Sequence, residues 1–241
     1  MKTGNFDALV LKSINFKDSD KILTLLSKDL GRISAKARGI RKINSKRLSF
    51  LDTLNYVRVG LVGEGDLKTV TEAKLVHSFP NLKKDLDRLN SAYYFIEILN
   101  KLIHESDDDS EVFDLVVKCL KRLDEVKYND TRVENYFELR LLEYLGYSLD
   151  FEKCCNCHKI LNFELNYSFN YESGGIECFE CQISVNYLKP EALKAILYLK
   201  GLYKSDDLEF TQLDTILKFY INDLIGGVPK SKKYLDFSFS A

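Results

Sequence analysis

The sequence has little of what membrane insertion or secretion requires. It contains no apolar run long enough to span a bilayer, which takes about 20 consecutive apolar residues. Its N-terminal stretch, MKTGNFDALVLKS, lacks the apolar core and the small-residue cleavage site of a secretory signal. We therefore expect a cytoplasmic protein whose cysteines are reduced.

Signatures of catalysis are also missing. The chain has only 3 histidines, and neither His77 nor His104 has a neighbouring nucleophile that would suit acid–base catalysis. It contains no P-loop, no dinucleotide-binding glycine motif and no nucleophile-elbow serine motif. No pair of carboxylates stands out by its spacing. These absences indicate a protein that is not an enzyme.

Positive charge is concentrated near the N-terminus. The chain has 241 residues and a net charge of −1, yet residues 1–80 carry 15 Lys/Arg against 8 Asp/Glu, a net of about +7. The rest of the chain then carries about −8. This asymmetry indicates a polyanion-binding N-terminal domain on a larger, neutral to acidic scaffold.

Four cysteines form two C-x-x-C pairs with twenty residues between them. Such pairs are typical of a closed, tetrahedral zinc site, because the two sulfurs of each tight turn face the same ion. Gly174 and Gly175, just before the second pair, suit a turn with positive φ and a close backbone approach. The predicted ligands are Cys154, Cys157, Cys178 and Cys181. Since four thiolates leave no open coordination position, we expect the zinc to be structural.

Other interpretations of the cysteines remain open at this point. A redox dithiol is expected near a βαβ pattern, which is not visible here, and disulfides suit a secreted chain better. Cys155 and His158 lie inside and directly after the first pair, so either is able to replace a ligand. Cys119 lies in an apolar helical run and is expected to be a small buried hydrophobic residue.

Residues 6–76 have the pattern of a small β-barrel. Two short β-prone runs, Phe6–Lys12 and Lys21–Leu26, precede a turn at residues 29–31. From Arg32 to Gly39 apolar and polar residues alternate, so one face of this strand enters a core and the other is basic and solvated. A second alternation lies between Leu54 and Leu75. About five short strands, closed on themselves, suggest a barrel.

The basic face of this barrel predicts contact with nucleic acid. Between Lys28 and Arg47 the sole acidic residue is Asp29, and Lys and Arg side chains supply the sequence-independent affinity for phosphates. The predicted DNA-contacting residues are Arg32, Lys36, Arg38, Arg41, Lys42, Lys46 and Arg47. Candidate stacking platforms for unpaired bases are Phe16, Phe50 and Tyr56, each of which also suits a core.

From Leu82 onward the apolar period becomes helical. A capping box at residues 131–134 starts one helix, and Gly146 ends it. After the cysteines, Pro190 begins a helix and Gly226 follows the last one. We expect the helices before and after the cysteine pairs to pack together.

These motifs occur in a characteristic order: a basic barrel, helices, a C-x-x-C…G-G-x-x-C-x-x-C knuckle, further helices and a basic tail. The segments that carry the pattern are Leu9–Leu11, Asp20–Leu25, Gly31–Ala35, Lys36–Arg41, Gly65–Leu67, Glu72–Leu75, Gly146–Tyr147, Ser173–Gly175 with Cys178 and Cys181, and Pro229–Leu235. On these residues the chain resembles RecO, a family of bacterial recombination mediators, over nearly its whole length. It departs from the family at His158, where Gly is usual.

The resemblance implies an α+β multidomain fold, with an N-terminal OB-fold barrel and a helical bundle interrupted by a four-cysteine zinc knuckle. The implied domains are residues 1–80, the DNA-binding OB-fold; 81–149, the first helical part; 150–185, the zinc-knuckle insertion; and 186–241, the second helical part with a basic tail. The zinc would be structural, since the four cysteines are not universal in the family.

The resemblance also implies a function in DNA repair and homologous recombination at the nucleoid. Such proteins bind single- and double-stranded DNA and anneal complementary strands. With RecR they help to load RecA onto strands coated by single-strand-binding protein, whose acidic C-terminal tail they contact. No membrane is implied as a partner.

Annealing needs no catalytic residue, only a surface that screens phosphate repulsion and leaves bases free to pair. A competing hypothesis is a non-enzymatic, zinc-stabilised interaction scaffold whose basic surface binds acidic partner tails and has little affinity for oligonucleotides. A zinc hydrolase is disfavoured, because four thiolates leave no coordination position for water.

Overall fold

The computed structural model describes residues 4–40, 49–63, 65–103, 110–125, 131–147, 149–184, 186–201 and 208–233. The chain divides into two compact units, one formed by Met1–Asn129 with Gly227–Ala241 and the other by Asp130–Gly226. Within the described ranges, no helix is both long and apolar enough to cross a membrane.

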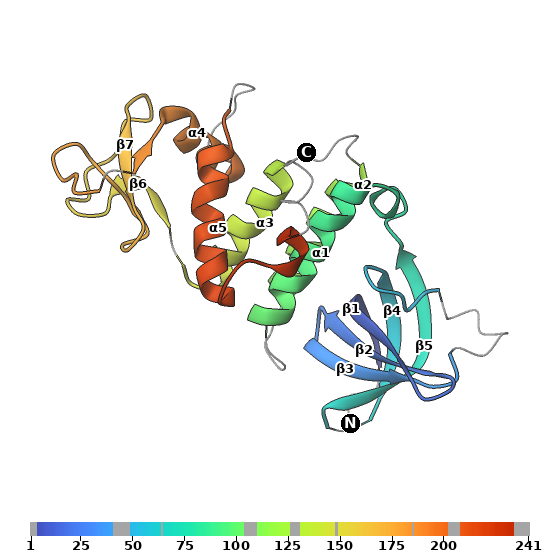
Figure 1. Ribbon diagram of the computed structural model, residues 1–241. Helices are drawn as coiled ribbons and strands as arrows, with labels where there is room; N and C mark the ends of the chain where they lie inside the picture. The colour runs from blue at the N-terminus through green and yellow to red at the C-terminus, as the bar shows by residue number, and fades with distance from the viewer. Residues whose placement is uncertain are drawn as a thin grey trace. The chain divides into compact units, whose positions relative to one another are not determined.

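The first unit begins with a closed five-stranded barrel (Figure 1). Its strands are β1 (Gly4–Phe16), β2 (Asp20–Ser27), β3 (Gly31–Ala37), β4 (Tyr56–Val62) and β5 (Leu67–His77). The order around the barrel is β1-β2-β3-β5-β4, and β4 pairs with β1 to close it. The β3–β5 pair is parallel, whereas the other four pairs are antiparallel. A small barrel of five strands in this order is an OB-fold, as expected from the sequence.

The predicted alternation places the barrel core correctly. Ala35 and Ala37 of β3 are buried in one cluster with Val57 and Val59 of β4, while Arg58 between the last two is exposed. The sequence pattern ended the first strand at residue 12, but β1 continues to Phe16. A bulge between Val10 and Lys12 breaks the period of two there, so the second half of the strand is invisible to a simple alternation.

Two helices of the first unit, α1 (Leu86–Leu102) and α2 (Ser110–Glu125), follow a short 3-10 helix, η1 (Leu82–Lys84). The carboxylate of Asp124 in α2 accepts hydrogen bonds from the backbone N–H groups of Asn81 and Leu82, both at 2.8 Å. Lys28, just after β2, donates to Asp114 of α2 at 2.8 Å. The Lys28–Asp114 pair joins the barrel to α2, and the Asp124 carboxylate joins the start of η1 to the same helix.

The predicted basic tail contains a further helix, α6 (Lys230–Lys233), which packs against α1 (Figure 1). Its first backbone N–H groups, those of Lys230 and Ser231, donate to the carboxylate of Glu97 at 2.8 and 3.0 Å. The Lys232 ammonium lies 4.7 Å from the ring centroid of Tyr94. The segment Lys230–Lys233 is thereby fixed to α1.

The second unit combines three helices with a small sheet (Figure 1). The helices are α3 (Thr131–Tyr144), α4 (Pro190–Leu199) and α5 (Thr211–Ile225). Both α3, before the cysteines, and α4, after them, pack against α5, so the predicted packing of the flanking helices is confirmed. The strands are β6 (Asp150–Cys154), β7 (Tyr167–Asn170), β8 (Gly175–Glu177) and β9 (Tyr187–Leu188), in the order β6-β8-β7-β9.

The predicted helix ends of this unit are confirmed. Gly146 has a φ of 86° and follows α3. Its N–H donates to the carbonyl of Glu143, and the N–H of Tyr147 donates to that of Leu142, which is the Schellman arrangement. Pro190 is the first residue of α4, and Gly226 caps α5 with a φ of 71°. The segment between α3 and α4, residues 149–189, is called the cysteine module below.

Candidate metal centre and nucleic-acid interface

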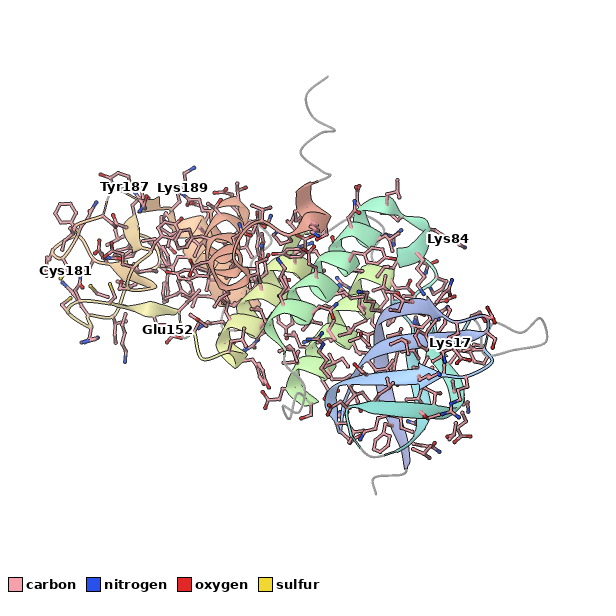
Figure 2. All side chains as sticks on the ribbon, turned by 60° about the horizontal axis from the view of Figure 1, so that its bottom comes forward. Lys17, Lys84, Glu152, Cys181, Tyr187 and Lys189 are labelled. Carbon is pink, nitrogen blue, oxygen red and sulfur yellow. The ribbon has the colours of Figure 1, made fainter. Side chains whose placement is uncertain are left out.

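The four predicted ligands meet at one point of the cysteine module. The sulfurs of Cys154, Cys157, Cys178 and Cys181 all lie within 4.8 Å of one another. The Sγ atoms of Cys157 and Cys178 are 3.7 Å apart. In a tetrahedral site with Zn–S bonds of about 2.3 Å, two sulfurs are roughly 3.8 Å apart, so the cluster fits a tetrahedral metal ion. Figure 2 labels Cys181 within the module.

Two short turns bring the sulfurs together. The N–H of His158 donates to the carbonyl of Cys154, and the N–H of Cys181 donates to that of Cys178, both at 2.9 Å. His158 has a φ of 60°, in the left-handed region that favours glycine. The position where the RecO pattern has Gly thus needs a left-handed backbone, and this chain adopts it with histidine.

Both glycines before the second pair have the roles that the sequence predicts. Gly174 has a φ of 67°. A Cβ atom on Gly175 would lie 2.6 Å from the Cβ atom of Cys155, which is closer than real Cβ contacts. The Cys155 N–H donates to the carbonyl of Ile176 at 2.8 Å, so β8 runs directly against the first pair. Neither Cys155 nor His158 belongs to the cluster that the described residues form.

The pKa values of three clustered thiols, Cys154, Cys178 and Cys181, favour a bound cation. Burial opposes ionisation of Cys154, but the backbone N–H groups of Cys157, Cys178 and Asn156 point at its sulfur, and together they lower the pKa to about 6. Hydrogen bonds to the sulfurs of Cys157 and Cys178 keep the proton on Cys181 and raise its pKa to about 12. Cys154 therefore ionises readily, whereas the raised pKa values of Cys178 and Cys181 oppose ionisation, and a bound divalent cation offsets that opposition.

A buried carboxylate, missed by the sequence reasoning, supports the second pair. Glu177 is fully buried, and its carboxylate accepts hydrogen bonds from the N–H groups of Ile183 and Ser184 and from Asn170 Nδ2, at 3.1, 2.9 and 2.8 Å. Burial opposes the charged form, but these donors outweigh it and lower the pKa of Glu177 to about 2. The loop that carries Cys181 is therefore closed by a charge-assisted network.

An aromatic cluster anchors the module on α5. The Tyr220 hydroxyl donates to the carbonyl of Tyr171 at 2.7 Å, and the Phe169 and Tyr171 rings meet edge to face. Burial raises the pKa of Tyr220 to about 12, so the hydroxyl stays a donor.

Cys119 lies in α2, away from the cysteine module in the sequence. Burial raises its pKa to about 12, as expected for a cysteine that packs as a hydrophobic residue.

The predicted DNA-contacting residues have different surroundings. Arg38 directly follows β3 and is exposed. Lys36 is half-buried and pairs with Asp20 at 3.0 Å. Arg32 Nη1 donates to the carbonyls of Asn100 and Ile103, at 3.2 and 3.0 Å, at the C-terminal end of α1. The other four, Arg41, Lys42, Lys46 and Arg47, lie outside the described residues.

The three candidate stacking residues also differ. The Tyr56 hydroxyl donates to Asp7 at 3.2 Å, and its ring meets Phe113 of α2 edge to face, so this side chain packs between elements. Phe50 is half-buried. Phe16 is the most exposed of the three, and the ammonium groups of Lys17 and Lys36 lie 5.6 and 5.1 Å from its ring centroid.

Comparisons with known proteins match both parts of the chain to one family. A family model described as "Recombination protein O N terminal" matches residues 1–79, and one described as "Recombination protein O C terminal" matches residues 83–233. A protein of Dehalococcoides mccartyi named "DNA repair protein RecO" is 31% identical over 246 residues, covering 95% of this chain and 93% of that protein. A protein of the same name from Rhodopirellula baltica is 30% identical over 210 residues, covering 86% of this chain and 77% of that protein.

Proposed function

Because this chain belongs to the RecO family of recombination and DNA repair proteins, we propose that it binds single- and double-stranded DNA and anneals complementary strands. The observation that carries the proposal is the OB-fold barrel with the exposed Arg38 directly after β3 and the half-buried Lys36 on the outer side of that strand. Such a surface screens the repulsion between two phosphate backbones and leaves the bases free to pair.

The roles of the described basic residues, Arg32, Lys36 and Arg38, follow from their surroundings. Arg38 is exposed and contacts phosphate directly, and Arg41, Lys42, Lys46 and Arg47 extend its charge along the chain. The charge of Lys36 is offset by Asp20, so its share of phosphate binding is smaller. Arg32 mainly stabilises the first unit, because its guanidinium donates hydrogen bonds to carbonyl groups at the C-terminal end of α1.

We further propose that the ion of the cysteine cluster is zinc, held by Cys154, Cys157, Cys178 and Cys181. Four thiolates at tetrahedral spacing are the ligand set of a closed zinc site. Zinc supplies structure here and takes no part in annealing, for which no residue of the chain acts as a catalyst. The further proposed partners are RecR, the acidic tail of single-strand-binding protein and, indirectly, RecA. We propose that the protein acts at the nucleoid.

The test is an annealing assay with two complementary labelled oligonucleotides at low and moderate salt. The protein should accelerate annealing, and the acceleration should fade as salt rises. Arg38→Glu should weaken strand binding and reduce the slope of log K against log salt by roughly 0.7, the value for one phosphate on a single strand. Lys74→Glu makes the same charge change at an exposed residue of β5, opposite Arg58 of β4, and is the matched control.

Equal losses in the two variants would show that net charge alone matters and would remove β3 from the interface. Absence of both acceleration and strand binding in the folded, metal-loaded protein would reject the annealing function and favour a scaffold that binds acidic protein tails.

A further inference from the structure

Phe16, the last residue of β1, is an aromatic side chain that the barrel does not need for its own core. It is 39% exposed and lies outside the core cluster, to which Ala8 and Val10 of the same strand belong. Aromatic side chains normally contribute a large buried area to a fold. A ring that stays in solvent at the end of a strand is available to a ligand.

Two lysines frame this ring. Lys17 and Lys36 place their ammonium groups 5.6 and 5.1 Å from the ring centroid, within the range of cation–π attraction. Lys36 is held in place by Asp20, which also accepts a hydrogen bond from the Gly39 N–H at 2.9 Å. The ring is therefore kept at the surface beside two ammonium groups. A base can stack on the ring while its phosphate lies near Lys17, and Lys36, whose charge Asp20 offsets, mainly positions the ring.

The strand register extends this surface across the barrel. Ile14 is two residues before Phe16, so it points to the same face, and it is 47% exposed. It pairs with Ile22 of β2, which pairs in turn with Lys36 of β3. This is the strand 2–3 face that OB-folds use for oligonucleotides, with the turn after strand 1 at its edge. Figure 2 labels Lys17 in that turn.

We infer that Phe16 is a base-stacking residue, and that it makes the barrel prefer unpaired nucleic-acid strands to duplexes. The inference rests on the proposed DNA-binding function and assigns its strand preference to one side chain. A duplex hides the faces of its bases in the helical stack, whereas an unpaired strand can lay a base on the ring. Phosphate contacts serve both forms of DNA, so they cannot supply such a preference.

The experiment compares the affinity of the full, metal-loaded chain for three probes of equal length: an oligothymidine strand, a duplex and a strand of abasic sugar phosphates. Phe16→Ala should weaken binding to oligothymidine by roughly 5- to 150-fold, the range expected for losing one stacked base. Affinity for the duplex and the abasic strand should stay within about twofold. The salt slope should be unchanged, because no phosphate contact is removed.

Two variants control for folding and for the loss of an exposed ring. Phe16→Trp keeps a stacking surface and should retain oligothymidine binding. Phe179→Ala removes a ring that is 87% exposed in the cysteine module and should leave all three affinities unchanged. Thermal unfolding of each variant checks that the barrel is intact.

Unchanged binding of oligothymidine by Phe16→Ala, or an equal loss for all three probes, would overturn the stacking role while leaving DNA binding in place. If the unaltered protein binds none of the probes at low salt, the proposed function itself fails. Loss of binding to oligothymidine alone, restored by Phe16→Trp, supports the inference.

Discussion

The barrel and the cysteine module are both small β structures, but different forces hold them together. The barrel strands are 7 to 13 residues long and close on one another around an apolar core. The strands of the module are 2 to 5 residues long. Strands that short form few ladder hydrogen bonds, so such a sheet is only marginally stable by itself.

The module has short strands, and specific side-chain contacts stabilise it instead of long strand ladders. Four sulfurs converge on one point, the buried Glu177 closes the second loop, and Tyr220 ties the sheet to α5. Hydrophobic burial is thus spread over many residues of the barrel, whereas a few specific groups stabilise the module. Single changes should therefore damage the module far more than the barrel.

Removal of the metal should have the largest effect. Structural zinc contributes about 10–16 kcal/mol in zinc-finger peptides at pH 7, so a chelator, or Cys157→Ser, should unfold the module. Hydrogen exchange followed by residue should then show amides of residues 150–188 losing protection while amides of β1 to β5 keep it.

Cys155→Ser is the matched control for this experiment, because Cys155 lies next to the ligands but outside the cluster. It should keep one metal ion per chain and normal protection of the module. If chelation exposes the barrel and the module equally, the two regions are one cooperative structure and the contrast between them is wrong.

Glu177→Gln should have the next largest effect, about 3 kcal/mol of destabilisation of the module. The substitution removes the charge; when the amide oxygen keeps the two backbone N–H donors, the N–H₂ group faces the donating Nδ2 of Asn170 in a fully buried place. Its measurement is the unfolding free energy of the metal-loaded protein. Glu172→Gln, at an exposed position in the same module, should change it by less than about 0.5 kcal/mol. Equal effects of the two substitutions would show that the buried network is not needed.

Local patterns sufficed to predict the barrel, the helix ends and the four-cysteine cluster. Each rests on a short-range rule: alternation for β3 and β4, glycine at a helix end for Gly146, and ligand spacing for the two C-x-x-C pairs. Alternation failed to predict the second half of β1. The bulge after Val10 adds one residue, so every later side chain of the strand points to the opposite face from the one that a period of two predicts.

Short-range rules cannot predict hydrogen-bond partners that lie far apart in the sequence. Alternation assigned Arg32 to the solvated face of β3, but it cannot show that the carbonyls of Asn100 and Ile103 lie over that position. In the same way, Glu177 looks like a surface residue in sequence, since the donors that permit its burial come from positions 170, 183 and 184.

Arg32 and Arg38 sharpen the comparison inside the barrel. Arg32→Ala should destabilise the first unit by about 2 kcal/mol, because a cation that donates to the last carbonyls of α1 is lost. Its salt slope for DNA binding should hardly change. Arg38→Ala should do the reverse, leaving the denaturant midpoint intact and flattening the slope. Denaturant unfolding and DNA titration of both variants measure this, and a flattened slope with normal stability for Arg32→Ala would make Arg32 a phosphate contact after all.

The smallest expected effect, a gain, is at His158. A residue with a side chain loses roughly 1–2 kcal/mol of stability when it adopts the left-handed conformation. Glycine avoids this strain, but its greater conformational freedom in the unfolded chain offsets part of the gain. His158→Gly should therefore stabilise the module by about 0.5 kcal/mol.

Lys159→Gly is the opposite control for His158→Gly. Lys159 is not among the described residues with positive φ, so the same replacement one position later should destabilise the module. Thermal unfolding and metal content of both variants are the measurements. Metal content should remain at one ion per chain in His158→Gly, since the imidazole lies outside the cluster, and loss of the ion would instead make His158 a ligand. A stabilised, fully loaded His158→Gly protein would mean that the module keeps a strained turn that its metal site does not require.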